Sequence, residues 1–347
     1  MDAGPLPAAA ERRRQREGVV LTGPFTGLLD ELADGVRVLG WAEGIHVRAQ
    51  YLRARNAVVR HLVARHGLRA VAAETHFALS RPVDAYVRGL GPAEPAAAVV
   101  RGVWSWWTGA ALRDNLALLA WLRRHNTGRA PADQVRFYGL EMYGAAPGDD
   151  AAAGPYAEPA DVRHAALLHR RRAAHRAAGG DHRDLAVRDA AQYLTFQEVA
   201  RRHPYGPILV FEQTEHLDRR VPGSLGEHLA RQEYGPFRAV GAVWREGDPA
   251  VRYPLGRYRE LSRHLARAAA ERSPGLLPGP AGTAALDLRP YRTPHRGPAA
   301  PALADAATAF DAALYAPALS PAPTLADAPD PPDAPGTAGP PDVPAAP

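Results

Sequence analysis

The sequence has 347 residues, 46% of them hydrophobic and 23% charged, so it can bury the core of one substantial domain. Its formal net charge is +5, but the basic residues are arginines scattered among Asp and Glu, which argues against nucleic acid as a partner. Cysteine is absent and no apolar run is long enough to span a bilayer, which excludes disulfides and thiolate chemistry and predicts a cytoplasmic protein without a membrane partner.

Short β-type runs alternate with longer helical patterns through the middle of the chain. The first run, at 36–42, is followed by a helical pattern that reaches Gly67, a residue type that often ends a helix. Further strands are predicted at 68–74, 135–141, 207–213 and 237–244. Because apolar strands that alternate with helices are typical of parallel sheets covered on both faces, we predict an α/β fold with a largely parallel β-sheet flanked by helices.

Three regions depart from this alternation. The segment around 155–204 is helical and has no strand of its own, which predicts a helical insertion or subdomain within a folded domain at 18–291. Residues 1–17 are expected to be disordered. Residues 292–347 are rich in Pro and Ala and are predicted to form a mostly disordered tail, with one helical stretch at 302–316.

Polar side chains follow four of the predicted strands, at the point where each strand ends. They are Glu43 and His46 after the first strand, Glu74 after the second, Glu141 after the third, and Gln213 and His216 after the fourth. Each of them alone has an ordinary structural explanation, such as a helix cap or an ion pair. Because the carboxyl ends of parallel strands meet at one edge of a sheet, we expect the group to form a single site.

The chemistry that such a group supports is proton transfer. A histidine oriented by a carboxylate can act as a general base, and Glu43 lies three positions before His46. Arg55, on the following helix, is our candidate for holding an oxyanion or a substrate carboxylate. These residues suit hydrolytic attack on an ester.

Motifs of other enzyme classes are absent from the sequence. It has no G-x-S-x-G elbow, no P-loop and no dinucleotide-binding glycine fingerprint. A metal site stays an alternative, because His46, His216, Glu43 and Glu74 are suitable ligands for zinc or iron, although no H-E-x-x-H spacing occurs among them.

These motifs and their order along the chain resemble those of the erythromycin esterase family. That family opens with an apolar strand and a G-E-x-x-H-G motif, which corresponds here to Ala42 through Val47. The similarity continues through "HGLRAVAAE", "VRFYGLE", "VRDAAQYL" and "ILVFEQTEH", and it covers most of 18–291.

The resemblance implies a hydrolase that needs no metal or cofactor and that acts on a small molecule such as a macrolide or another natural product. It implies His46 as the base that activates water, Glu43 as its orienting partner and Glu74 as a second acidic participant. It further implies a substrate-binding set of Arg55, Glu141, Arg188, Gln213 and His216.

The sequence also departs from the family pattern around the expected base. Ala42 and Val47 replace the flanking glycines, and Gln50 replaces an acidic residue. Gln213 and Thr214 stand where the family has His and Asn. Three functions therefore stay open: hydrolysis of an ester or lactone, with a role in antibiotic resistance or secondary metabolism; a biosynthetic tailoring step such as lactonisation, elimination or cyclisation; and ligand binding without catalysis. The oligomeric state is also open.

Overall fold

The computed structural model describes residues 21, 23–91, 113–143, 156–249, 251, 254–292 and 300–321, and the statements below concern these residues. The predicted N-terminal segment 1–17 and the part of the predicted tail at 322–347 lie outside them.

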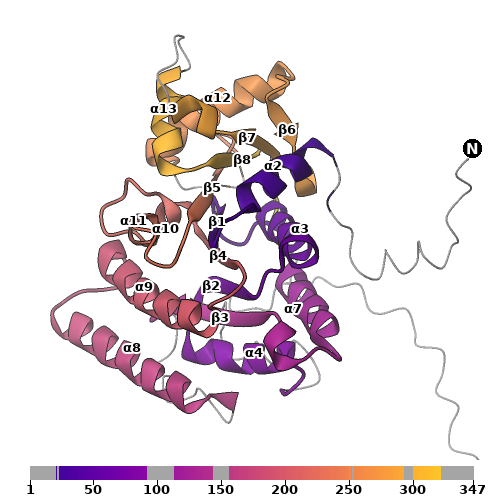
Figure 1. Ribbon diagram of the computed structural model, residues 1–347. Coiled ribbons are helices and arrows are strands. Elements are labelled where there is room, and N and C mark those ends of the chain that lie inside the picture. The colour runs from indigo at the N-terminus through magenta and orange to yellow at the C-terminus, as the bar shows by residue number, and fades with distance from the viewer. Residues whose placement is uncertain are drawn as a thin grey trace, which may run out of the picture.

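An eight-stranded sheet runs through the middle of the protein in the order β3-β2-β4-β1-β5-β8-β7-β6 (Figure 1). The strands are β1 Val38–Glu43, β2 Ala70–His76, β3 Arg136–Glu141, β4 Ile208–Gln213, β5 Phe237–Trp244, β6 Leu276–Pro278, β7 Ala284–Asp287 and β8 Ala312–Ala316. Neighbours from β3 through β8 pair in parallel, whereas β7 and β6 pair antiparallel at one end. The prediction of a largely parallel α/β fold is therefore confirmed.

Helices cover both faces of this sheet. They are α2 Pro24–Ala33, α3 Ala49–His66, α4 Arg81–Val87, α7 Arg113–Asn126, α8 Pro159–Ala177, α9 Leu185–Arg202, α10 Thr214–Leu217, α11 Leu225–Ala230, α12 Arg259–Ala270 and α13 Ala300–Ala309. Short 3-10 turns lie at Ala78–Ser80, Pro131–Asp133, Gly256–Tyr258, Pro280–Gly282 and Arg289–Arg292. Figure 1 shows α2, α3 and α7 on one side of the sheet and α9, α10 and α11 on the other. None of the described helices is long and apolar enough to cross a membrane.

Burial on both faces explains why the central strands are so uniformly apolar. Every residue of β1 and of β2 is buried, as expected for parallel strands between two helical layers. The helix after β1 ends as predicted: Gly67 adopts a left-handed conformation with φ of 65° and donates its N–H to Leu62 O.

Helices α8 and α9 occupy the region that the sequence predicts as helical, between β3 and β4. No strand interrupts them within the described residues 156–207. Helix α9 packs directly against β3 and β2, whereas α8 packs on α9 and on the turn after β2. Helix α9 thus belongs to the main domain and brings its side chains to the carboxyl end of the sheet.

The C-terminal part of the described chain differs from expectation. The sequence predicts a helix over 302–316 and a folded domain that ends at 291, but α13 ends at Ala309 and β8 then pairs in parallel with β5. All five residues of β8 are buried. The run "AALYA" has no β-branched residue to indicate a strand, and its place between β5 and β7 decides its conformation.

Candidate active site

The central strands end in register with one another, so that their carboxyl ends lie at one edge of the sheet. Glu43, the last residue of β1, pairs with Gln213, the last residue of β4, and His76 of β2 pairs with Glu141 of β3. The register of β2 shifts just before His76, around Glu74, and such a bulge redirects side chains. Four strands therefore deliver polar groups to the same edge.

His46 lies in the loop that joins β1 to α3, and its imidazole contacts the strand end that precedes it. Its Nδ1 atom lies 2.5 Å from Glu43 Oε1. The loop passes close to the core at Gly44, where a Cβ atom would lie 2.7 Å from the Tyr51 hydroxyl, so a larger residue would displace the loop. Burial alone would lower the pKa of His46, but the carboxylates of Glu43 and Glu74 outweigh it, and the pKa rises above its ordinary value.

Val47 follows His46 and adopts the left-handed backbone region, with φ of 62°. A β-branched residue is strained there, because its Cβ crowds the neighbouring carbonyl, whereas glycine adopts this conformation freely. The family pattern that the sequence resembles has glycine at this position. The structure therefore gives a backbone reason for that glycine, and this chain carries the strain next to His46.

Glu74 is the centre of the charged network below His46. Its Oε2 atom lies 3.8 Å from His46 Nε2 and accepts the backbone N–H of Gln213 at 3.2 Å. Its Oε1 atom accepts from Arg188 Nη2 at 2.9 Å and lies 3.4 Å from His216 Nε2. Burial opposes ionisation of Glu74, but these cationic groups hold its pKa well below the ordinary value.

His216 of α10 connects Glu74 to a second buried carboxylate. Its Nδ1 atom lies 2.5 Å from Asp189 Oδ1, and Asp189 Oδ2 accepts the backbone N–H of Leu225 at 2.7 Å. Burial works against a charged imidazole, yet Asp189 and Glu74 raise the pKa of His216 well above its ordinary value. His216 thus lies between two carboxylates that both favour its protonated form.

Arg188 of α9 joins Glu74 to Glu141. Its Nε and Nη2 atoms lie 2.8 and 2.7 Å from Glu141 Oε2. Glu141 also accepts from Gln192 Nε2 at 3.2 Å and from the backbone N–H of Met142 at 2.7 Å. Arg188 therefore links Glu74 to Glu141 by ion pairs. Neither Arg188 nor Glu141 is among the described residues that line the cleft.

A cleft of about 680 Å³ lies above this network, with His46 in its wall. Its described lining is Gly44, Ile45, His46, Val47, Arg48, Gln213, Thr214, Glu215, Trp244, Pro254, Leu255 and Tyr258. Trp244, Leu255 and Tyr258 form an apolar side, whereas His46 and Arg48 provide polar groups. The volume and the mixed lining are typical of a site for a small molecule.

Comparisons with known proteins bear on the fold and on residues 63–178, which include Glu74 and Glu141. A model of the erythromycin esterase family matches residues 63–178. The structure of an erythromycin esterase, EreC, a histidine-to-asparagine variant in its open conformation, has the same fold, with a TM-score of 0.59 and 14% identity over 91% of this chain and 98% of that one. The family match over residues 63–178 and the shared fold support a member of the erythromycin esterase family.

Two further solved structures share the fold. A Bacillus cereus protein matches with a TM-score of 0.60 and 13% identity, over 92% of this chain and 99% of that one. A succinoglycan biosynthesis protein matches with a TM-score of 0.51 and 13% identity, over 92% of this chain and 99% of that one. At this identity the likeness shows the fold, and family and fold together support a hydrolase-like function on a small-molecule substrate.

Arg55 is not among the residues that line the cleft. Its guanidinium is buried against the Phe211 ring, with 4.8 Å from Cζ to the ring centroid, and its Nη2 atom donates to Asn115 Oδ1 at 2.8 Å. Burial lowers the pKa of Arg55 to about 10, although the charges of Glu43 and Asp114 oppose this. Arg55 is three residues after Leu52, on the face of α3 that packs into the core, and this spacing could have indicated its burial.

Gln50, which replaces an acidic residue of the family pattern, also points away from the cleft. Its side-chain amide donates to Ser320 Oγ at 3.0 Å, and its side-chain oxygen accepts from Ser320 N at 3.0 Å. These two hydrogen bonds of Gln50 therefore connect the segment that follows β8 to the start of α3.

Glu212 of β4 is a site residue that the sequence reasoning missed. It is 1% exposed, and neither carboxylate oxygen has a hydrogen-bond partner among the described residues. Burial, and then the charge of Glu74, raises the pKa of Glu212 well above its ordinary value and so favours its neutral form. The signal that could have found it is a lone carboxylate within the otherwise apolar run "PILVFEQ".

Glu74, Glu212 and His216 also offer ligand atoms that lie within 4.8 Å of one another. This donor set could hold a metal ion by type, but Arg188 already donates to Glu74 at 2.9 Å. A cation at this place would face the guanidinium at short range, so the observed charges favour the metal-free arrangement.

Proposed function

We propose that this protein hydrolyses an ester or lactone of a natural product and that His46 is the general base. The main support is the 2.5 Å distance between His46 Nδ1 and Glu43 Oε1, together with the place of His46 in the wall of the cleft. With Nδ1 donating its proton to Glu43, the imidazole is fixed in the tautomer that accepts a proton at Nε2.

The nucleophile in this proposal is a water molecule between His46 and Glu74. The 3.8 Å between His46 Nε2 and Glu74 Oε2 suits two groups that share one water. Because Arg188 and His216 keep Glu74 ionised, its carboxylate can accept one hydrogen bond from that water while His46 takes the other proton. The water oxygen would then attack the carbonyl carbon of an ester in the cleft.

We assign the contact to the developing oxyanion to Arg48 in place of Arg55. Among the described residues that line the cleft, Arg48 is the sole guanidinium, whereas Arg55 of α3 is buried outside that lining. A guanidinium at the cleft wall can donate to an oxyanion or to a substrate carboxylate without giving up its charge.

The apolar wall supports a substrate with a large hydrocarbon surface. Trp244, Leu255 and Tyr258, which line the same cleft as His46, would contact such a substrate, and a macrolide or another natural product meets this requirement. Such a substrate would give the enzyme a role in antibiotic resistance or secondary metabolism, and we propose the cytoplasm as its location.

The test compares the wild type with His46→Asn on a panel of macrolides and simple esters, in water enriched in ¹⁸O. We expect ¹⁸O in the product carboxylate and a loss in kcat/KM of about 10³-fold in the variant, because the general base is removed. His169→Ala, an exposed histidine on α8, is the matched control and should keep wild-type kinetics. Equal turnover by His46→Asn would refute the assignment. Conversion without ¹⁸O would point to a tailoring reaction, and tight binding without turnover would point to a non-catalytic homologue.

A further inference from the structure

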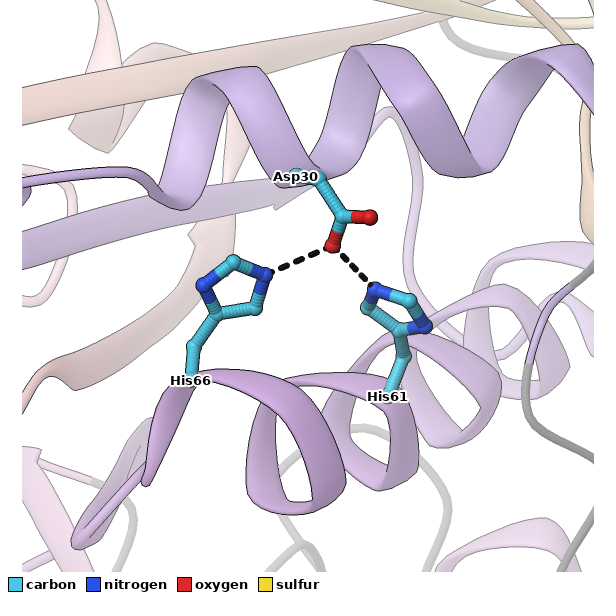
Figure 2. Close-up of side chains that lie close together, drawn as sticks. All are labelled: Asp30, His61 and His66. Atoms are coloured by element: carbon cyan, nitrogen blue, oxygen red, sulfur yellow. Dashed lines mark hydrogen bonds and ion pairs between the residues drawn. The ribbon is translucent and has the colours of Figure 1, made fainter.

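A second group of ionisable side chains lies away from the cleft, where α2 packs on α3. Figure 2 shows Asp30 of α2 facing His61 and His66, which both come from α3. The Nε2 atoms of the two imidazoles each lie 2.6 Å from the same carboxylate oxygen, Asp30 Oδ1. The three residues are not part of the cleft lining, and the proposed hydrolysis does not use them.

The packing of the two helices fixes these side chains in place. On α2, Leu29 and Leu32 are buried, and on α3 Leu62 is buried next to His61. The His61 side chain itself is 0% exposed. The group is therefore held by rigid elements of the fold, which is what a selective binding site requires.

We propose that Asp30, His61 and His66 form a binding site for a divalent transition-metal ion, and that the ion is Zn²⁺. Two imidazole nitrogens and one carboxylate oxygen form a ligand set that zinc accepts well. The three ligand atoms converge on one point, since all lie within 4.8 Å of one another.

Only small movements would admit the ion. Zinc bonds of about 2.0 to 2.1 Å in a tetrahedral arrangement place neighbouring ligand atoms about 3.3 Å apart. The two Nε2 atoms now lie 2.6 Å from Asp30 Oδ1, so each pair must open by roughly 0.7 Å, which side-chain rotation can supply.

The surroundings favour a cation and leave a path for it. The side chains of Asp30 and His66 are 31% and 19% exposed, so an ion can enter from solvent and keep a water molecule as its fourth ligand. Helix α3 ends at His66, and the carbonyl groups at a helix C-terminus carry partial negative charge. Burial opposes ionisation of Asp30, but the two imidazoles keep its pKa below the ordinary value, so the carboxylate is charged at neutral pH.

The bound ion would fasten α2 to α3. Without it, two imidazoles share one carboxylate oxygen, and each must carry a proton on Nε2 to donate. With it, each imidazole binds the ion through Nε2 and carries its proton on Nδ1, and a single ion bonds to all three residues. Because the ion binds the folded chain, it also raises the melting temperature.

The test titrates the full-length, tag-free chain with Zn²⁺ and, as a spectroscopic probe, with Co²⁺. We expect one saturable ion with micromolar or tighter affinity, a visible Co²⁺ absorption band of low coordination number, and a melting temperature that rises with zinc and falls with a chelator. His66→Ala removes a ligand at the exposed end of the group, and Asp30→Asn keeps the side-chain shape. Each should weaken binding at least tenfold.

Two controls separate this site from other histidines and from the carboxylates near the cleft. His169→Ala removes an exposed histidine on α8, and Glu212→Gln disables the group of Glu74, Glu212 and His216. Both variants should bind the ion as the wild type does. Absence of saturable binding, or binding that survives in both His66→Ala and Asp30→Asn, would overturn the proposal. Circular dichroism in the presence of a chelator verifies that each variant is folded.

Discussion

Replacing Val47 tests whether the loop that carries His46 is strained. Val47 has φ of 62°, and a residue with a Cβ atom in the left-handed region costs about 1 to 2 kcal/mol relative to glycine. Glycine costs about 0.4 to 1 kcal/mol more than alanine to order, because its unfolded chain is more flexible. The difference leaves Val47→Gly about 1 kcal/mol more stable than Val47→Ala.

The comparison of these two variants, rather than of either with the wild type, cancels the loss of the valine side chain from the cleft wall. Thermal unfolding should show Val47→Gly melting about 1 to 2 °C above Val47→Ala. Val63, on α3, provides the matched control, because in a helix the order reverses and Val63→Gly should be about 1 kcal/mol less stable than Val63→Ala. If Val47→Ala is as stable as Val47→Gly, the loop is not strained and the reasoning fails.

Two further predictions concern the proton balance of the site. Glu43→Gln removes a carboxylate that raises the pKa of His46. In the wild type we expect the acid limb of the pH profile of kcat/KM above pH 6.5, and in the variant this limb should move to lower pH. An acid limb that does not move would contradict the role of Glu43. Glu212 has a raised pKa in the folded state, so the stability that its proton contributes is complete below its unfolded pKa and is lost as pH rises toward the folded value. Glu212→Gln should therefore gain stability over the wild type between pH 5 and pH 8, measured by thermal unfolding, and a constant difference would show that Glu212 is ionised.

The five strands predicted from the sequence all lie in the sheet, because buried parallel strands need apolar residues along their whole length and few other segments are so uniform. Strand β8 escaped prediction for the converse reason. Alanine and leucine favour a helix. The segment is a strand because it pairs with β5 on one side and β7 on the other, in a space that small side chains fit. At Gly241 of β5, for example, a Cβ atom would lie 2.6 Å from the Phe310 ring that precedes β8.

Some residues of the candidate site could likewise be predicted from the sequence, and others could not. Glu43, His46, Glu74 and Glu141 could be grouped from the sequence, since strand ends meet at one edge of any parallel sheet. The contacts of α9 could not be predicted from the sequence, because the face that α9 turns toward the site depends on how the helix packs against β3. Asp189 and its ion pair with His216 became evident only in three dimensions.

The charges of the site explain why a neutral Glu212 and a basic His46 belong together. Around Glu74, within the described residues, the buried carboxyl groups of Glu141 and Asp189 pair with Arg188 and His216. A further negative charge on Glu212 would have no partner at low dielectric, so that group keeps its proton. The remaining negative field favours proton uptake by His46, which strengthens it as a base, but it also disfavours an oxyanion. We therefore expect the proposed hydrolysis to need a cation on the cleft side of His46, and Arg48 is the described guanidinium that lines the cleft.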